Sequence, residues 1–384
     1  MSKPWRVVLA GGLVLALLYG GAWATVDRYG ASRAIAWLEA DTGDIDRFPS
    51  RVILAGTEAL ELPVGEPLDL ATVWPTSDPE GLHDPAAFLD QTGTVAFLLV
   101  QDGTLRYERY AEGHTGDGLR TSFSVAKSIV STLIGLAIAD GAIGSIDDPV
   151  TDYVPELLDR DPRYAQIIIR HLVTMSSGLR YQERFHPFSD EAQTYYSTDL
   201  RATGLSAQID GEPGQEFLYN NYNLLLEGLI LERATGERIA DYLSRRLWQP
   251  MGAEADASFS LDSKDRGFEK MESGFNAIPR DYARFGLLVA NAGRVEDRQI
   301  IPEDWLDMAT SAERSDAPVD FYAAHWWTGT PTGESFPVGH ALAWGNHGQF
   351  IYVAPDRDLV IVRLGDTYGT AEWPQILSAI ASRL

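Results

Sequence analysis

The stretch TSFSVAKSIVSTLIGLAIADG, residues 121–141, decides the fold of this chain. Apolar residues recur in pairs four positions apart over residues 125–138, and Gly141 follows the last pair. This period predicts a helix that is apolar almost all round, with Thr121 or Ser122 available to cap its start. We therefore expect a strongly apolar helix that ends at Gly141.

Segments typical of strands lie on both sides of this helix, near the two ends of the chain. Each is apolar or alternating and is bounded by a turn signal such as Asp102-Gly103 or Pro355-Asp356. The expected strands are residues 95–100, 105–110, 350–353 and 359–364, and a closing helix is expected over residues 373–384. The region between them, about residues 147–291, is mostly helical in pattern. The sequence thus predicts an α/β (α+β) chain, with an antiparallel sheet built from both ends and an inserted helical lobe.

The amino terminus has the pattern of an export segment. Lys3 and Arg6 precede eighteen uncharged residues, 7–24, and a small-x-small cleavage pattern ends at Ala24. A run of this length fits either a cleaved signal peptide or an uncleaved membrane anchor, and the preceding positive charges place the rest of the chain outside the cytoplasm. The expected domains are a signal or anchor (1–26), an N-terminal extension (27–90) and a main domain (91–384).

Composition limits the function classes. The 384 residues contain 31 Lys+Arg and 55 Asp+Glu, so the net charge is −24, and a chain this acidic repels nucleic-acid phosphates. Cysteine is absent, which excludes disulfides, thiol nucleophiles and thiolate metal sites. Only four of the basic residues are lysines, at positions 3, 127, 264 and 270. A lysine far from the ends of the sequence is therefore a candidate for a specific role.

Ser124 and Lys127 form an S-x-x-K pattern at the start of the predicted helix. Residues three apart lie one above the other on a helix face, so the amine would reach the hydroxyl. A serine becomes a strong nucleophile when a nearby base takes its proton, and a buried lysine can be that base because burial lowers its pKa. The Ser124 backbone N–H, at a helix N-terminus, would help to hold a developing oxyanion.

Several motifs together resemble one enzyme family. They are TSFSVAKSIVSTLIG (121–135), DDPVTDYVPEL (147–157), RHLVTMSSGL (170–179), PGQEFLYNN (213–221) and FNAIPRDYARFGLLVANAG (275–293). In this order they resemble the serine hydrolases related to class C β-lactamases. That family includes penicillin-binding DD-peptidases, certain esterases and the 6-aminohexanoate-dimer hydrolases. The resemblance covers about residues 94–384 and implies a β-lactamase/transpeptidase-like fold.

The resemblance implies roles for particular residues. Ser124 would be the acylated nucleophile, and Lys127 and Tyr219 would form its base and proton relay. Which of the two is the base stays open, because they would titrate as a coupled pair. Asn221 would hydrogen-bond Lys127 or the substrate carbonyl.

The third signature of the family differs from the lactamase pattern. β-Lactamases and DD-peptidases generally carry Lys-Thr-Gly on the strand that lines the site, and this chain has none. Residues 344–349, WGNHGQ, resemble instead the Gly-x-His-Gly-Gln run of the aminohexanoate-dimer hydrolases. A backbone N–H near Asn346 would be the second oxyanion donor, and Gly345 would allow close approach of the substrate. His347 is either part of this substrate site or a structural residue that bridges loops.

The sequence therefore predicts an exported serine hydrolase that cleaves a small amide or ester through an acyl-enzyme and needs no metal or organic cofactor. A DD-peptidase or β-lactamase is the nearer alternative. A non-catalytic, membrane-tethered binding module is the more distant one. We expect a small-molecule substrate, no nucleic-acid partner, and contact with the membrane through the N-terminal segment if that segment is not cleaved. The sequence predicts neither the natural substrate nor the oligomeric state.

Overall fold

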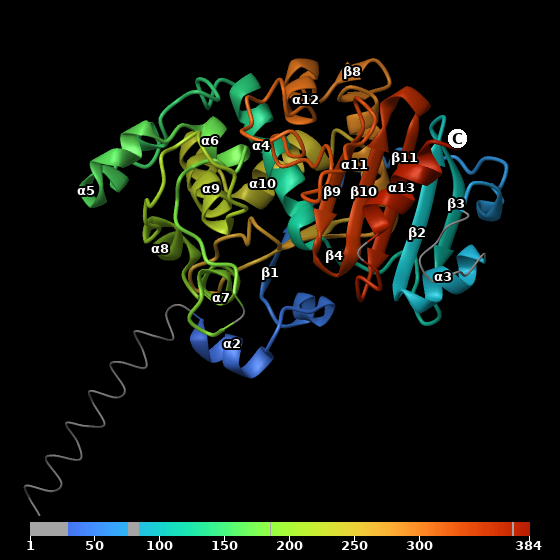
Figure 1. The fold of residues 1–384 in the computed structure, drawn as a ribbon, viewed down its shortest axis with the longest axis horizontal. Coiled ribbons are helices and arrows are strands. Elements are labelled where there is room, and N and C mark those ends of the chain that lie inside the picture. Colours follow the sequence, from blue (N-terminus) through green and yellow to red (C-terminus); the bar gives the residue numbers. More distant parts are fainter. Residues whose placement is uncertain (1–29, 76–83, 185, 371) are drawn as a thin grey trace, which may run out of the picture.

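The computed structural model describes residues 30–75, 84–184, 186–370 and 372–384. Its main sheet has five strands in the order β3-β2-β11-β10-β9, and every neighbouring pair is antiparallel. The sheet lies on one side of the molecule and the helical lobe on the other (Figure 1). The strands are β2 (Thr94–Gln101), β3 (Thr104–Tyr110), β9 (Ala341–Gly345), β10 (Gln349–Ala354) and β11 (Leu359–Gly365). The predicted sheet from both ends of the chain is confirmed.

Helices cover both faces of this sheet, which explains why β2 and β11 read as continuous apolar runs rather than alternating ones. On one face, Phe97 and Ile361 pack with Phe88 of α3 and Trp373 of α13. On the other face, Val100 and its neighbours join the large core that contains α4. The covering helices are α3 (Pro85–Gln91) and α13 (Trp373–Ala381) on the first face and α4 (Ala126–Ala139) and α11 (Pro279–Ala290) on the second.

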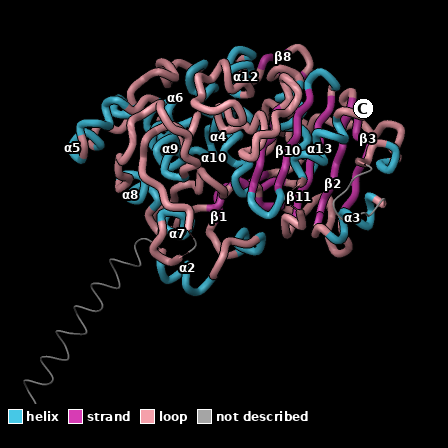
Figure 2. The backbone as a smooth tube through the Cα atoms, in the orientation of Figure 1, coloured by secondary structure: helices cyan, strands magenta, loops and turns pink. Residues whose placement is uncertain are grey.

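The lobe between the sheet halves is mostly helical, as predicted, and surrounds α4 (Figure 2). Twelve residues of α4 are buried, including every large apolar one up to Leu136. The helices of this lobe are α5 (Leu157–Arg160), α6 (Ile169–Val173), α7 (Asp190–Tyr196), α8 (Leu200–Leu205), α9 (Asn221–Thr235) and α10 (Ile239–Leu243). Beyond α11, a short hairpin β7 (Arg294–Val295) and β8 (Arg298–Gln299) leads to α12 (Glu303–Ala309).

A second, smaller sheet was not predicted. Its order is β1 (Ser50–Ile53), β5 (Ala257–Ser260), β6 (Phe275–Ala277) and β4 (Arg120–Thr121). These strands have two to four residues each, too short for a clear alternation in sequence. The sheet ties the N-terminal region, which also forms α2 (Ala31–Trp37), to the segments that lead into and out of the site.

The start of α4 differs from the expectation. A short 3₁₀ turn, Phe123–Val125, precedes the helix, and neither Thr121 nor Ser122 caps it through its side chain. Thr121 ends β4, and the Ser122 hydroxyl donates to the Phe123 carbonyl at 3.0 Å. Ser124 therefore lies in a tight turn between a strand and a helix, rather than in the helix itself.

Within the described ranges, no helix is both long and apolar enough to cross a membrane. The predicted signal or anchor, residues 1–26, lies outside the described residues.

Candidate active site

Ser124 and Lys127 meet as the S-x-x-K spacing predicts. The Lys127 Nζ donates to the Ser124 Oγ at 2.9 Å and to the Glu272 backbone carbonyl at 2.9 Å. Ser124 is held by the turn after β4, and Glu272 lies just before β6, the strand that pairs with β4. The small sheet therefore places the serine and the carbonyl that anchors the lysine side by side.

The Lys127 amine is buried, with 2% of the residue exposed. The pKa of the Lys127 amine is lowered to about 7, mainly by burial and slightly by the nearby Lys270, although Glu272, Glu227 and Glu183 act in the opposite direction. None of the described carboxylates lies within ion-pair distance of this amine. At neutral pH a large share of the amine is therefore unprotonated, and it can accept a proton from Ser124.

Tyr219 lies immediately before α9, with its ring over the Lys127 amine at 4.9 Å. Burial raises the pKa of the Tyr219 hydroxyl, and the Ser124 hydroxyl opposes that effect. The phenol thus keeps its proton near neutral pH and can serve as a proton donor. Of the two predicted base candidates, Lys127 is the one with a pKa suited to accept a proton.

Asn221 does not make the expected contact with Lys127. Its Nδ2 donates to the Tyr181 hydroxyl at 2.9 Å, and its buried Oδ1 has no partner among the described residues. The amide of Asn221 therefore binds Tyr181 rather than the lysine. The alternative expectation, a hydrogen bond to the substrate carbonyl, stays a prediction.

Gly345 ends β9 directly against the nucleophile turn. A Cβ atom at this position would lie 2.3 Å from the Ser122 carbonyl oxygen and 3.2 Å from the Ser124 nitrogen. Only glycine lets the strand pass this closely. Asn346 follows it on the pocket wall, so the backbone of residues 345–346 and that of Ser124 face the same space.

His347 bridges loops, which favours the structural alternative for its ring. Its Nδ1 lies 2.9 Å from the Asp366 carbonyl oxygen, and its Nε2 lies 2.8 Å from the Ala40 carbonyl oxygen. The ring also packs against Phe123, with centroids 5.2 Å apart. The buried Arg363 also donates to the Gly348 carbonyl at 2.7 Å. The turn at residues 346–348 is thus fixed on several sides.

These residues open on a pocket of about 420 Å³. Three glutamates line it, Glu183, Glu191 and Glu272, whereas none of the described lining residues is Lys, Arg or His. Its aromatic walls are Phe123, Tyr181, Tyr195, Tyr196, Phe217, Tyr219, Trp327, Trp344 and Tyr368. Sequence reasoning missed the three glutamates, because single acidic residues carry no spacing signal.

Comparison with known proteins agrees with this geometry. The family model described as Beta-lactamase matches residues 86–381, and the chain belongs to this family. The N-terminal extension of the chain, up to residue 85, lies outside the match.

Two similar proteins are hydrolases. The 6-aminohexanoate-dimer hydrolase of Paenarthrobacter ureafaciens is 28% identical over 318 residues, which cover 76% of each chain. Esterase EstB of Burkholderia gladioli is 30% identical over 209 residues, covering 49% of this chain and 50% of the esterase. Together with the family match, they identify this chain as a serine hydrolase.

A solved structure described as a putative 6-aminohexanoate-dimer hydrolase from Bacillus anthracis superposes with a TM-score of 0.75. It is 23% identical, and the match covers 87% of this chain and 89% of the other. A penicillin-binding protein homologue from Caulobacter crescentus matches with a TM-score of 0.60 at 16% identity, over 84% of this chain and 99% of the other. These likenesses confirm the predicted β-lactamase/transpeptidase-like fold.

The pKa of Lys127 predicts how the reactivity of Ser124 depends on pH. An unprotonated amine is the form that can take the Ser124 proton, so we expect labelling of Ser124 by a fluorophosphonate to rise with pH and level off above a midpoint near pH 7. Below the midpoint, the rate should fall about tenfold per pH unit. Labelling rates from pH 5 to 9 would check this. A flat profile, or a midpoint near 10, would contradict the assignment of Lys127 as the base.

Proposed function

We propose that this serine hydrolase cleaves small linear amides or short esters through an acyl-enzyme on Ser124. The observation that carries the proposal is the 2.9 Å hydrogen bond between the Ser124 hydroxyl and a buried lysine amine whose pKa is near 7. A serine next to such an amine can be deprotonated as it attacks a carbonyl carbon. The pocket opens directly above this pair.

The proposed reaction has two steps. In the first, Lys127 takes the Ser124 proton while Oγ bonds to the substrate carbonyl carbon, and the N–H groups of Ser124 and Asn346 hold the oxyanion. Tyr219 gives its proton to the leaving nitrogen or oxygen and is reprotonated by Lys127, whose ammonium lies below the phenol ring. In the second, water attacks the acyl group by the same proton path and releases the acid and free Ser124.

The charge of the pocket supports a substrate with a free amine. Glu183 and Glu191 line the pocket together with Glu272, and the described lining offers no cation to bind a carboxylate. The missing Lys-Thr-Gly removes the anchor that β-lactams and D-Ala termini generally use. One relative is named for an aminohexanoate dimer, whose amino end fits this charge pattern and whose carboxylate end does not. The DD-peptidase and β-lactamase alternative is disfavoured for the same reason.

We also propose that the protein is exported, with the catalytic domain outside the cytoplasm and a membrane contact through the N-terminal segment if it is not cleaved. The support is the sequence alone: a positive start followed by the uncharged run at residues 7–24.

The first test labels the nucleophile. The full chain should form a fluorophosphonate adduct on Ser124, located by mass spectrometry, and Ser124→Ala should abolish it. Lys127→Met should slow labelling by about 10²-fold or more, because the general base is lost. Lys264→Met, which removes an exposed lysine, is the matched control and should label normally. No adduct, or one on another serine, would favour the non-catalytic binding module.

The second test concerns substrate choice. An amide or ester with a terminal amine should be cleaved with a higher kcat/KM than its uncharged analogue. Glu191→Gln should lower that value about tenfold, equivalent to about 1.4 kcal/mol, for the amine substrate alone. Steady-state kinetics on the matched pair measure this. Faster cleavage of nitrocefin or a D-Ala-D-Ala peptide than of simple esters would instead support the β-lactamase or DD-peptidase function.

The third test is localisation. In a bacterial host, the full chain should be recovered in the membrane or periplasmic fraction. The double variant Leu15→Arg/Leu18→Arg should remain in the cytoplasm, because two charges interrupt the apolar run. Recovery of the unchanged chain from the cytoplasm would refute export.

A further inference from the structure

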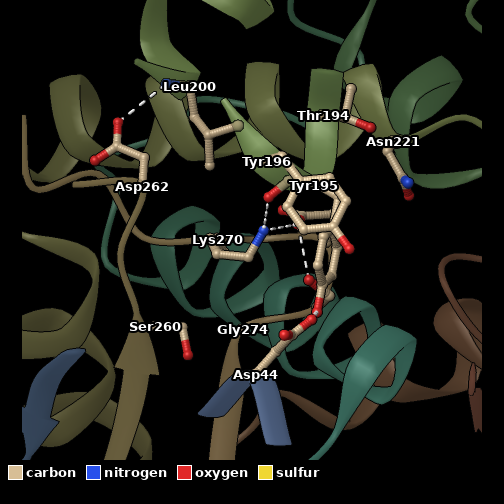
Figure 3. Close-up of polar contacts among 12 residues, drawn as sticks. Asp44, Thr194, Tyr195, Tyr196, Leu200, Asn221, Ser260, Asp262, Lys270 and Gly274 are labelled. Atoms are coloured by element: carbon tan, nitrogen blue, oxygen red, sulfur yellow. Dashed lines mark hydrogen bonds and ion pairs between the residues drawn. The ribbon is translucent and has the colours of Figure 1, made fainter. Parts of the chain in front are cut away.

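Lys270 is, after Lys127, the second buried lysine among the described residues, and the proposed reaction does not use it. It lies between β5 and β6 and is 1% exposed. Its Nζ donates to the Glu272 Oε1 at 2.9 Å and to the Tyr195 carbonyl oxygen, and it faces the rings of Tyr195 at 4.0 Å and Phe48 at 4.6 Å. Figure 3 shows the amine pointing at Tyr195. The Lys270 amine is therefore enclosed by a carboxylate, a backbone carbonyl and two aromatic rings.

Glu272 connects the two buried lysines. Its carboxylate binds Lys270 and accepts from the Ser273 hydroxyl at 2.8 Å, while its backbone carbonyl accepts from Lys127. The second carboxylate oxygen, Oε2, is buried and has no partner among the described residues. Glu272 thus binds Lys270 through its side chain and Lys127 through its backbone carbonyl.

The charges around Lys127 show what Lys270 contributes. Three carboxylates act on its amine: Glu272 from the loop before β6, Glu227 from α9, and Glu183 from the loop at the pocket wall. Glu227 is already bound to His325 through both oxygens at 2.9 Å. Glu272 has the largest influence of the three, and its carboxylate is held by Lys270. Without that cation, the buried carboxylate would turn to the Lys127 ammonium for compensation.

We propose that Lys270 is a positioning residue for the reaction. It holds the Glu272 carboxylate away from Lys127, and it fixes the turn at residues 270–273, whose carbonyl anchors the Lys127 amine. The inference rests on the proposed function of Ser124 and Lys127. It assigns a role outside the pocket, since Lys270 is not among the residues that line it.

Contacts of Tyr195 and Lys270 also join the N-terminal region to the site. The Tyr195 hydroxyl donates to Asp44 at 2.9 Å, and Phe48 packs against the Tyr195 ring and the lysine. Figure 3 shows Asp44, Tyr195 and Lys270 in one cluster. A segment that lies before the matched family region therefore helps to seat the residue that positions the catalytic lysine.

The test compares pH profiles of fluorophosphonate labelling for the full chain and its variants. Lys270→Met should move the midpoint of the acidic limb upward by about one pH unit, so that labelling near pH 6 is about tenfold slower, while the alkaline plateau changes little. The double variant Lys270→Met/Glu272→Gln, which replaces the ion pair by neutral residues of similar shape, should return the midpoint to the wild-type value or below it. Lys264→Met should leave the profile unchanged.

The outcomes separate the two proposals. If the unchanged chain forms no adduct on Ser124, the proposed function fails. If it does, but Lys270→Met lowers the rate equally at every pH or leaves the midpoint in place, the positioning role of Lys270 is refuted. If Lys270→Met does not fold, the double variant decides: a midpoint above that of the wild type would overturn the proposal. Thermal unfolding of each variant shows which case applies.

Discussion

The site depends on keeping one amine out of water and away from any carboxylate that would pair with it. Lys127 meets this condition because α4 is buried on every side and because its amine binds a hydroxyl and a carbonyl, both uncharged. Burying an amine in this way costs stability, since the charged form loses its hydration. The large apolar core around α4 offsets that cost, so the fold and the reactivity of Ser124 rest on the same helix.

Three pieces of sheet bring the other groups to this amine. The turn after β4 carries Ser124, the turn before β6 carries the Glu272 carbonyl, and the end of β9 carries the backbone of Gly345. Each group lies at or next to a strand whose hydrogen-bonded neighbours fix the backbone. Groups on such supports need little reorganisation during a reaction, which is the requirement for oxyanion stabilisation.

The fold could be predicted from the sequence because its main strands and α4 have long, clear periods. Ser124 and Lys127 could be predicted too, since a spacing of three on a helix is a local property. Tyr219 came only from resemblance, because nothing local distinguishes it from other half-buried tyrosines. The roles of Glu272 and Lys270 could not be predicted: Glu272 acts through a backbone oxygen on a residue 145 positions away, and no side-chain pattern records such a contact. Asn221 was placed correctly in the motif, but its partner, Tyr181, lies on a loop without a period.

Two non-glycine residues of the site, Phe123 and His347, adopt left-handed backbone conformations, with φ of 44° and 56°. One precedes the nucleophile and the other follows Asn346, and their rings pack on each other. Left-handed backbone is costly for such residues and persists only where surrounding contacts hold it. Each turn is therefore braced by the other, and loosening either would disturb both of the backbone N–H groups proposed to hold the oxyanion.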